Sequence, residues 1–144
     1  MLVRFEGLRL KPYLCPAGVP TIAVGLTVYP DGRKVTMHDA PMTETEAMES
    51  TEWLVRHVYL PQTVALCPGI DTPGRLAAIT DFCFNLGAGA LKVSTLRRKI
   101  NAGAWDQVPA ELRKWVKGGG RTLPGLVKRR EAECALVEKI KGAA

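Results

Sequence analysis

Three side chains near the start of the chain have types and spacing that suit acid–base chemistry. Glu6 is followed after eight residues by Cys15, and Cys15 is followed after five residues by Thr21. Gly7 is typical of the residue that ends a helix, so Glu6 is expected in the last turn of a short helix. The negative end of the helix dipole disfavours a carboxylate there and favours the protonated acid. Glu6 is therefore a candidate proton donor.

The residues that follow Glu6 predict how the chain turns back towards it. Pro12 to Gly18 favours an extended segment and then a turn, and Val19 to Thr27 is rich in β-formers. A returning strand would bring Cys15 and Thr21 towards Glu6. The sequence thus predicts a proton donor that faces a thiol and a hydroxyl across a small gap.

A small sheet and a long helix are expected to carry this site. Extended signals continue from Tyr13 to about Met37, with a turn at Pro30-Asp31-Gly32, and predict a three-stranded antiparallel sheet. Thr43-Glu44-Thr45-Glu46 is a capping box, and the apolar spacing after it predicts a helix from about 43 to 60. Pro61 is expected to break or kink that helix.

The remaining elements are predicted to be helices around a buried centre. Thr72-Pro73 opens a helix whose apolar run to Leu86 leaves it almost no polar face, so this helix should be central. Further helices are expected at 95–100, at 105–116 and from Pro124, the last with an apolar stripe. Gly118-Gly119-Gly120 is interpreted as a flexible connector. The stripe consists of Leu126, Val127, Arg130, Cys134, Val137 and Ile140.

Charge is distributed unevenly along the chain. Residues 1–91 hold 7 Lys/Arg and 9 Asp/Glu, a difference of −2, and residues 92–144 hold 13 and 5, a difference of +8. A basic surface suits nucleic acid, an anionic membrane or an anionic cell-wall polymer, and it also suits a plain solvated helix face. Because the basic segment lacks interleaved aromatic residues, nucleic acid is not expected as a partner.

The four cysteines do not form a metal-binding pattern. Cys15, Cys67, Cys83 and Cys134 show no CxxC spacing and only two histidines accompany them, so neither a metal nor a cofactor is expected. Cys83 is expected to be a small core residue, and Cys67 and Cys134 can pair in an oxidising compartment. Four cysteines allow three connectivities, and the sequence does not select one.

The spacing Glu-x8-Cys-x5-Thr resembles the catalytic arrangement of the phage-type lysozymes, the endolysin muramidases, in which the middle position is Asp or Cys. Other segments also resemble the family and follow its order, so the resemblance covers nearly the whole chain. These segments are Glu6 to Tyr13, Pro16 to Ile22, Phe84 to Gly87, Ser94 to Leu96, Asn101 to Gly103 and Leu123 to Glu131.

The resemblance implies a lysozyme-like fold of the α+β class that is mainly α. A small three-stranded antiparallel sheet lobe, at about 12–40, would be joined by a long helix to a larger helical lobe at about 60–144, with a cleft between the lobes. The whole chain, 1–144, would form one such domain. This sequence departs from its relatives where they commonly have Gly-Tyr or Gly-Trp and then His, because it has Ala23-Val24 and then Leu26.

The resemblance also implies hydrolysis of the β-1,4 bond between N-acetylmuramic acid and N-acetylglucosamine in bacterial peptidoglycan, leading to lysis of the host cell. Glu6 would be the general acid that protonates the glycosidic oxygen. Since such relatives mostly invert, Cys15 and Thr21 would hold or deprotonate the attacking water on the opposite face of the sugar. Two alternatives remain: a catalytically weak peptidoglycan-binding module, in which Cys in place of Asp has disabled turnover, and a lytic transglycosylase.

Further residues match family segments outside this catalytic set. Phe84, Asn85 and Thr95 match segments that line the sugar-binding cleft, although Phe84 equally suits the core. In the family an arginine of the C-terminal helix approaches the catalytic glutamate, and either Arg129 or Arg130 is a candidate for that role. The alternative for both arginines is a place on the helix surface.

The role of Cys15 depends on the pKa of its thiol. A free thiol is mostly protonated at neutral pH and lacks the fixed charge of an aspartate. If a neighbouring cation lowers the pKa, Cys15 acts as a thiolate base, and Arg9, Lys11 or one arginine of the last helix is a candidate cation. Otherwise Cys15 and Thr21 only position water.

The expected setting is that of a monomer acting on peptidoglycan. No apolar run long enough to span a membrane and no secretory signal is visible in the sequence. The protein is expected in the cytoplasm of the bacterial host until it is released to the periplasm and cell wall. The alternative is export by an upstream segment that lies outside this chain.

Overall fold

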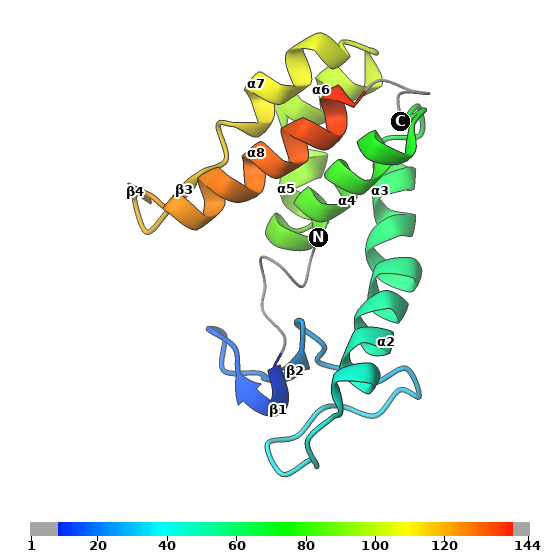
Figure 1. Ribbon diagram of the computed structural model, residues 1–144, viewed down its shortest axis with the longest axis vertical. Helices are drawn as coiled ribbons and strands as arrows, with labels where there is room; N and C mark the ends of the chain where they lie inside the picture. Colours follow the sequence, from blue (N-terminus) through cyan, green and yellow to red (C-terminus); the bar gives the residue numbers. More distant parts are fainter. Residues whose placement is uncertain (1–8, 140–144) are drawn as a thin grey trace. The chain divides into compact units, whose positions relative to one another are not determined.

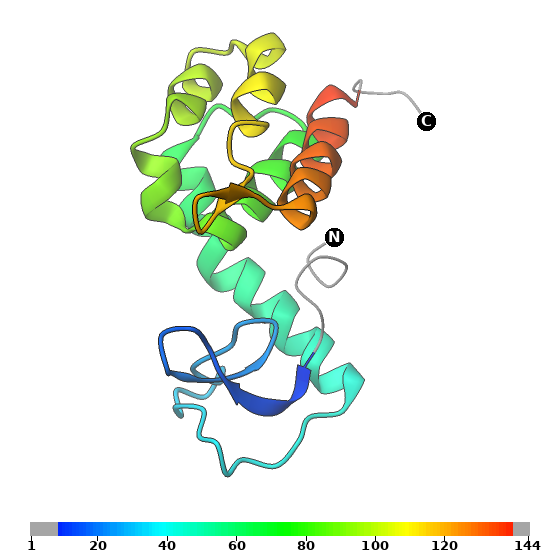
Figure 2. The ribbon, with the colours of Figure 1, turned by 90° about the vertical axis from the view of Figure 1, so that its left-hand side faces the viewer.

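The computed structural model describes residues 9–139, and the helix expected to end at Glu6 lies outside this part of the chain. The chain divides into two compact units, Met1–Val58 and Tyr59–Ala144. The first contains a hairpin and a helix, and the second is mainly helical (Figures 1 and 2). Together the two units give the α+β, mainly helical class that was predicted.

The sheet of the first unit is a two-stranded hairpin. β1, Arg9–Leu14, pairs antiparallel with β2, Pro20–Ala23, and Tyr13 lies opposite Thr21. The expectation of three regular strands was wrong in this detail, because the chain after β2 forms only the isolated bridges Ile22–Leu26 and Val28–Lys34.

Side chains in the loop after β2 explain why a third strand does not form. The Asp39 carboxylate accepts hydrogen bonds from the backbone N–H of Thr36 at 2.9 Å and from the Tyr29 hydroxyl at 2.7 Å. Asp31 similarly accepts from the backbone N–H of Arg33 at 2.9 Å. Local bonds of this kind use the main-chain donors that a strand would need.

The first helix packs on this hairpin unit. α2, Glu44–Leu54, begins at Thr43, whose side chain accepts from the backbone N–H of Glu46 at 3.1 Å, as the capping box predicted. Within the unit α2 lies beside the hairpin and its loop (Figure 2). A small apolar core forms between them from Ile22, Leu26 and Val35, with Tyr29, Met42 and Leu54 packed against it.

Of the break or kink expected at Pro61, the break does not occur, and an irregular turn lies before the proline instead. A π-helical turn, Val55–Tyr59, follows α2, and α3 then runs from Leu60 to Leu66. Proline lacks an N–H and its ring crowds the carbonyl four residues earlier. The wider π turn lies just before Pro61 and accommodates that crowding, so the helical path continues.

The centre of the helical unit is α4, Pro73–Leu86, as predicted. Thr72 accepts from the backbone N–H of Arg75 at 3.1 Å, and Gly87 ends the helix with a φ of 92°. Ala78 to Cys83 are all buried. The surrounding core also contains Cys67, Leu91, Leu96, Ile100, Val108, Leu112, Cys134 and Val137.

Short elements connect α4 to the last helix. In chain order they are α5 at Ala88–Lys92, α6 at Thr95–Asn101, a 3₁₀ turn at Trp105–Gln107, α7 at Val108–Leu112, β3 at Lys117–Gly118 and β4 at Arg121–Thr122. The helix expected at 105–116 therefore ends at Leu112. The expected glycine connector is instead the turn of a hairpin, because Gly119 and Gly120 both have positive φ, which a tight hairpin turn requires.

The last helix, α8 at Pro124–Glu138, lies along α4 (Figure 1). Its buried face differs in part from the predicted stripe: Val127 is exposed, and Arg129 and Glu133 are buried beside Arg130. The two helices approach closely, because a Cβ atom added at Gly74 would lie 2.5 Å from the Leu136 carbonyl oxygen. The contact between α4 and α8 therefore combines close backbone packing with buried charge.

Candidate active site

The structure brings Cys15 and Thr21 together at the turn end of the β1–β2 hairpin. Cys15 follows β1 directly, and Thr21 is the second residue of β2. The backbone N–H of Cys15 donates to the Val19 carbonyl at 3.1 Å, and that of Gly18 donates to the Cys15 carbonyl at 2.8 Å. These bonds close the turn that the proline and glycine residues predicted.

The turn surrounds the Cys15 sulfur with main-chain donors. Hydrogen bonds from the backbone of Val19 and Ala17, with a smaller contribution from the Thr21 hydroxyl, lower the pKa of the Cys15 thiol below its ordinary value. Donors directed at a sulfur favour the charged thiolate. Because the thiol is only half-buried, it is also accessible to a reactant.

Thr21 is held more rigidly than Cys15. Its side chain is buried, and its hydroxyl donates to the Val19 carbonyl at 2.9 Å. A hydroxyl carries a single proton, so the Val19 carbonyl and the Cys15 sulfur compete for it. The pair can therefore accept a proton at sulfur and reorient a hydroxyl donor beside it, which is the capacity needed to bind and activate water.

Of the two alternatives for Cys15, the structure favours a lowered thiol pKa, but its causes are not the cations that the sequence suggested. The largest causes are backbone donors and not a cation. The Arg9 guanidinium lies over the Tyr13 ring, 4.6 Å from its centroid, and Lys11 is exposed on β1. The predicted proton donor, Glu6, lies outside the described residues, so its distance to Cys15 and Thr21 stays a prediction.

The three predicted sugar-contacting residues all lie in the helical unit. Phe84 and Asn85 are close to the end of α4, and Thr95 begins α6. All three are partly exposed. The Phe84 ring packs edge-on against Tyr59 with ring centroids 4.8 Å apart, and the Thr95 hydroxyl accepts from Arg98 at 2.8 Å.

Arg129 and Arg130 are buried, so the surface alternative is wrong for both. Arg129 donates to both oxygens of Asp81 at 2.9 Å. Arg130 donates to the Asn85 side-chain oxygen at 2.8 Å and lies 2.7 Å from a Glu133 oxygen. Whether either arginine approaches Glu6 stays a prediction.

Sequence reasoning missed Asp81 and Glu133, although each left a signal. Asp81 is the one acidic residue in the apolar run of α4, which is a sign of a paired buried charge. Glu133 follows Arg130 by one helical turn, a spacing that places the two side chains side by side. Neither signal says which partner lies on the neighbouring helix.

The cysteines of the helical unit form no disulfide bond, and they belong to no group arranged to bind a metal among the described residues. All four cysteines are free, so the open pairing of Cys67 with Cys134 does not occur in this structure. Burial raises the pKa of both thiols to about 11. Among residues 9–139, no group of His, Cys, Asp and Glu is arranged to hold a metal ion.

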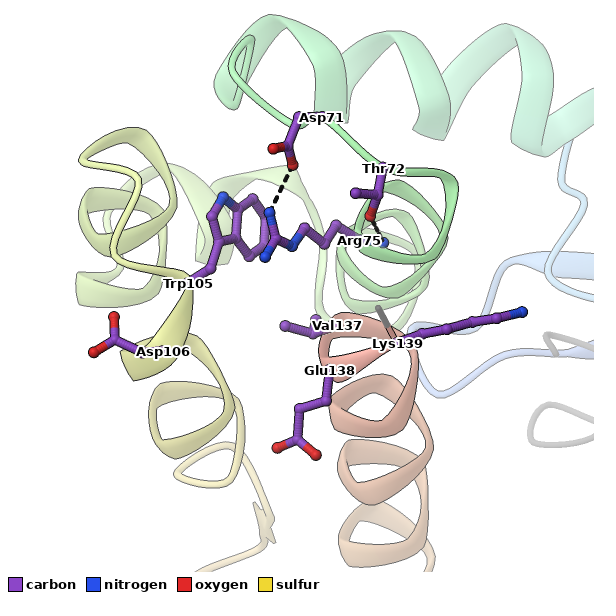
Figure 3. A pocket seen from close by; sticks show the side chains of 8 residues that line it. All are labelled: Asp71, Thr72, Arg75, Trp105, Asp106, Val137, Glu138 and Lys139. Carbon is purple, nitrogen blue, oxygen red and sulfur yellow. Dashed lines mark hydrogen bonds and ion pairs between the residues drawn. The ribbon is translucent and has the colours of Figure 1, made fainter. Parts of the chain in front are cut away.

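A separate pocket of about 470 Å³ lies in the helical unit, where α4 begins and α8 ends (Figure 3). The Arg75 guanidinium lies over the Trp105 ring, 4.4 Å from its centroid, and pairs with Asp71 at 2.8 Å. Asp106, Glu138 and Lys139 also line it. None of the predicted site residues lies in this pocket.

No helix between residues 9 and 139 is long and apolar enough to cross a membrane.

Comparison with known proteins agrees with these features. Residues 3–133 match the family described as phage lysozyme. The endolysin of Acyrthosiphon pisum secondary endosymbiont phage 1 is 37% identical over 145 aligned positions, covering 96% of this chain and 92% of that protein. The SAR-endolysin of Escherichia phage Mu is 31% identical, covering 99% of this chain and 78% of that protein.

A solved structure of another endolysin has a similar fold over nearly the whole chain. The endolysin from Escherichia coli O157:H7 phage FAHEc1 superposes with a TM-score of 0.79 at 26% identity. The match covers 95% of this chain and 87% of that one. Sequence and structure comparisons thus point to one group of proteins.

Proposed function

Because this chain belongs to the phage lysozyme family and is a peptidoglycan-hydrolysing endolysin, a glycoside hydrolase of the muramidase type, we propose that it cleaves the β-1,4 bond between N-acetylmuramic acid and N-acetylglucosamine by inversion. Glu6 is the general acid, and Cys15 with Thr21 binds and activates the attacking water. The observation that carries this assignment is the adjacent thiol and hydroxyl on the β1–β2 turn, with the thiol pKa lowered by backbone donors.

The proposed reaction divides the chemistry between two faces of the sugar. Glu6 gives its proton to the glycosidic oxygen as the bond to the anomeric carbon breaks, which is worth roughly a hundred- to ten-thousandfold in rate. Water attacks the anomeric carbon from the opposite side and loses a proton to Cys15 as the thiolate. Thr21 holds that water through its hydroxyl. Glu6 and Cys15 return to their starting protonation states by proton exchange with solvent.

Product analysis tests the reaction type. Purified peptidoglycan is digested with the wild-type protein, and the fragments are separated and weighed by mass spectrometry. Hydrolysis is expected to leave reducing N-acetylmuramic acid ends that carry one added water. Anhydro ends would overturn the assignment in favour of a lytic transglycosylase. Binding without any fragment release would favour a peptidoglycan-binding module.

The anomeric configuration of the first product tests inversion separately. Digestion followed immediately by proton NMR is expected to show the α-anomer of the new reducing end before mutarotation mixes the anomers. A β-anomer would indicate retention and would require a covalent intermediate. That result would reassign Cys15 from water activation to direct attack on the sugar.

The remaining residues are proposed to serve binding. Phe84, Asn85 and Thr95 contact the sugar chain, and the basic excess of residues 92–144 concentrates the protein on an anionic envelope rather than on nucleic acid. The protein works as a monomer after export to the periplasm. Activity on permeabilised cells is expected to fall with added salt more than activity on a short soluble glycan, because salt screens exposed charges.

A further inference from the structure

Two buried arginines on α8 reach α4, and they differ in how well their partners satisfy them. Arg129 forms a two-bond pair with Asp81, with both nitrogen–oxygen distances at 2.9 Å and both side chains almost fully buried. This geometry matches the planar fork of a guanidinium to a carboxylate. Arg129 therefore has a clear structural reason to be there.

Arg130 is more deeply buried and less well satisfied. It has no exposed surface, and its Nη2 atom lies 2.8 Å from the Asn85 Oδ1 atom and 2.7 Å from the Glu133 Oε1 atom. The contact with Glu133 does not have hydrogen-bond angles. Within the described residues, both Glu133 oxygens and the Nε and Nη1 atoms of Arg130 are buried without a hydrogen-bond partner.

This pair is a poor source of stability. Burial raises the pKa of Glu133 to about 8 and lowers the pKa of Arg130, so desolvation opposes both charged forms. Buried ion pairs with incomplete hydrogen bonding can often be replaced by apolar side chains of similar volume without loss of stability. Stability alone therefore does not explain why α8 carries both charges.

The effect of Arg130 on Asn85 supplies a different explanation. A guanidinium only donates hydrogen bonds, so the side-chain oxygen of Asn85, and not its nitrogen, must face Arg130. The amide nitrogen then points away from α8. Within residues 9–139 it has no hydrogen-bond partner, and it is not among the buried unpaired atoms, so its N–H groups face solvent.

We propose that Arg130 and Glu133 are positioning residues that fix the Asn85 amide with its N–H donors outward, ready to bind an acetamido carbonyl or hydroxyl oxygen of an amino sugar. This inference rests on the proposed function, because it takes the glycan as the ligand of Asn85. Glu133 holds the Arg130 guanidinium in place through their 2.7 Å contact, and Arg130 selects one of the two amide orientations. Without Arg130 and Glu133 the Asn85 amide can rotate, and its own oxygen would then face the acceptor oxygen of the sugar.

The decisive variant removes both charges together. Arg130→Met with Glu133→Leu replaces the pair by apolar side chains of similar volume and is expected to melt at or near the wild-type temperature. The KM for soluble peptidoglycan fragments is expected to rise about fivefold to tenfold, the value of one hydrogen bond, with kcat changed much less. A well-folded double variant with wild-type KM would overturn the proposal.

The exposed pair Arg113 and Glu131 is the matched control. Its atoms are 2.7 Å apart and Glu131 also lies on α8, but both side chains are about half exposed, unlike the buried Arg130 and Glu133. Arg113→Met with Glu131→Leu is expected to leave KM unchanged. An equal rise in KM in this control would mean that the loss of charge, and not the orientation of Asn85, caused the effect.

Substitutions of Asn85 itself complete a double-mutant cycle with the Arg130 and Glu133 changes. Asn85→Ala is expected to raise KM by about the same factor, and adding the Arg130 and Glu133 changes to it should cause no further rise. Asn85→Asp keeps an acceptor for Arg130 but removes the outward donors, so it should also raise KM. If KM in the variant that combines all three substitutions rose by the product of the separate factors, Arg130 and Glu133 would not act through Asn85.

Side-chain NMR separates this proposal from the proposed function. In ¹⁵N-labelled protein the Asn85 side-chain amide is expected to show a high order parameter in ¹⁵N relaxation, which should fall in the Arg130→Met/Glu133→Leu variant because the amide can then turn about its Cβ–Cγ bond. Ordered signals in both proteins would overturn the positioning role even if the enzyme cleaves peptidoglycan. Loss of order in the variant would support positioning even if digestion of peptidoglycan failed.

Discussion

In the β1–β2 hairpin, main-chain hydrogen bonds orient the candidate catalytic side chains, whereas along α4 and α8 buried side chains orient one another. The Cys15 thiol is half-buried and takes its lowered pKa from backbone donors. Arg129 and Asp81, by contrast, are almost inaccessible and satisfy each other through two bonds. A change at Cys15 should therefore alter chemistry with little effect on folding, and a change that breaks the Arg129–Asp81 pair should chiefly lower stability.

The largest expected effect on stability comes from breaking the Arg129–Asp81 pair. Asp81→Asn removes the charge that forms the two-bond pair with the buried Arg129, which is expected to cost about 3 to 5 kcal/mol in the free energy of unfolding. Urea denaturation followed by circular dichroism measures this. Glu131→Gln, which breaks the exposed pair with Arg113, is the control and should cost less than about 1 kcal/mol. Equal losses in the two variants would remove the contrast between buried and exposed pairs.

Close packing of α4 on α8 gives a second test. An added Cβ at Gly74 would lie 2.5 Å from the Leu136 carbonyl oxygen, so Gly74→Ala must push the helices apart. We expect a loss of about 1 to 3 kcal/mol in the free energy of unfolding. Gly125→Ala, also in a helix but with nothing within 4 Å, should be neutral or slightly stabilising. A neutral Gly74→Ala would show that the helices separate at little cost.

In the hairpin, changes at Cys15 are expected to alter rate and pH dependence but not stability. Because a thiolate is the proposed base and protonated Glu6 the proposed acid, activity should show a bell-shaped dependence on pH, and the lowered pKa of the Cys15 thiol increases the fraction of protein that holds both required forms. Cys15→Ser should lose most of the activity, and Cys15→Asp should keep much of it. In Cys15→Asp the acidic limb should move to lower pH, since a carboxyl ionises near about 4.

A thiol-blocking reagent provides the control for Cys15. It should inhibit the wild-type enzyme and leave Cys15→Asp active, because Cys67, Cys83 and Cys134 are buried and their thiol pKa values are raised. A fully active Cys15→Ser enzyme would assign water activation to Thr21 alone.

The smallest effect is expected from a strained residue at the end of β2. Ala23 has a φ of 55°, in the left-handed region that favours glycine. Ala23→Gly should raise the free energy of unfolding by about 0.5 to 1 kcal/mol, without changing the rate of peptidoglycan cleavage. Ala47→Gly, in the buried face of α2, should lower it by about 1 kcal/mol. A destabilised Ala23→Gly would show that this strain is small.

Local signals in the sequence predicted several elements well because neighbours along the chain determine them. The caps at Thr43, Thr72 and Ser94 begin the expected helices, and each accepts the expected backbone bond. The turn after Cys15 also formed as predicted. Such features depend on a few consecutive residues, so sequence patterns are sufficient to find them.

Features that depend on distant residues could not be predicted in the same way. The third strand was lost to local bonds made by Asp31 and Asp39, which compete with pairing across the sheet. The burial of Arg129 and Arg130 depends on Asp81 and Asn85, more than forty positions earlier in the chain. A basic residue in a helix is usually exposed, so only the partner helix shows that these two are not.

The most direct test of the central claim is the rate at which Glu6→Gln releases reducing ends from purified peptidoglycan, measured beside the wild type. The glutamine keeps the shape of Glu6 but has no proton to give. We predict an unchanged melting temperature and unchanged peptidoglycan binding, with a rate reduced by roughly a hundredfold or more. Release of reducing ends by Glu6→Gln at near the wild-type rate would contradict the account, because the proton would then have to come from another group.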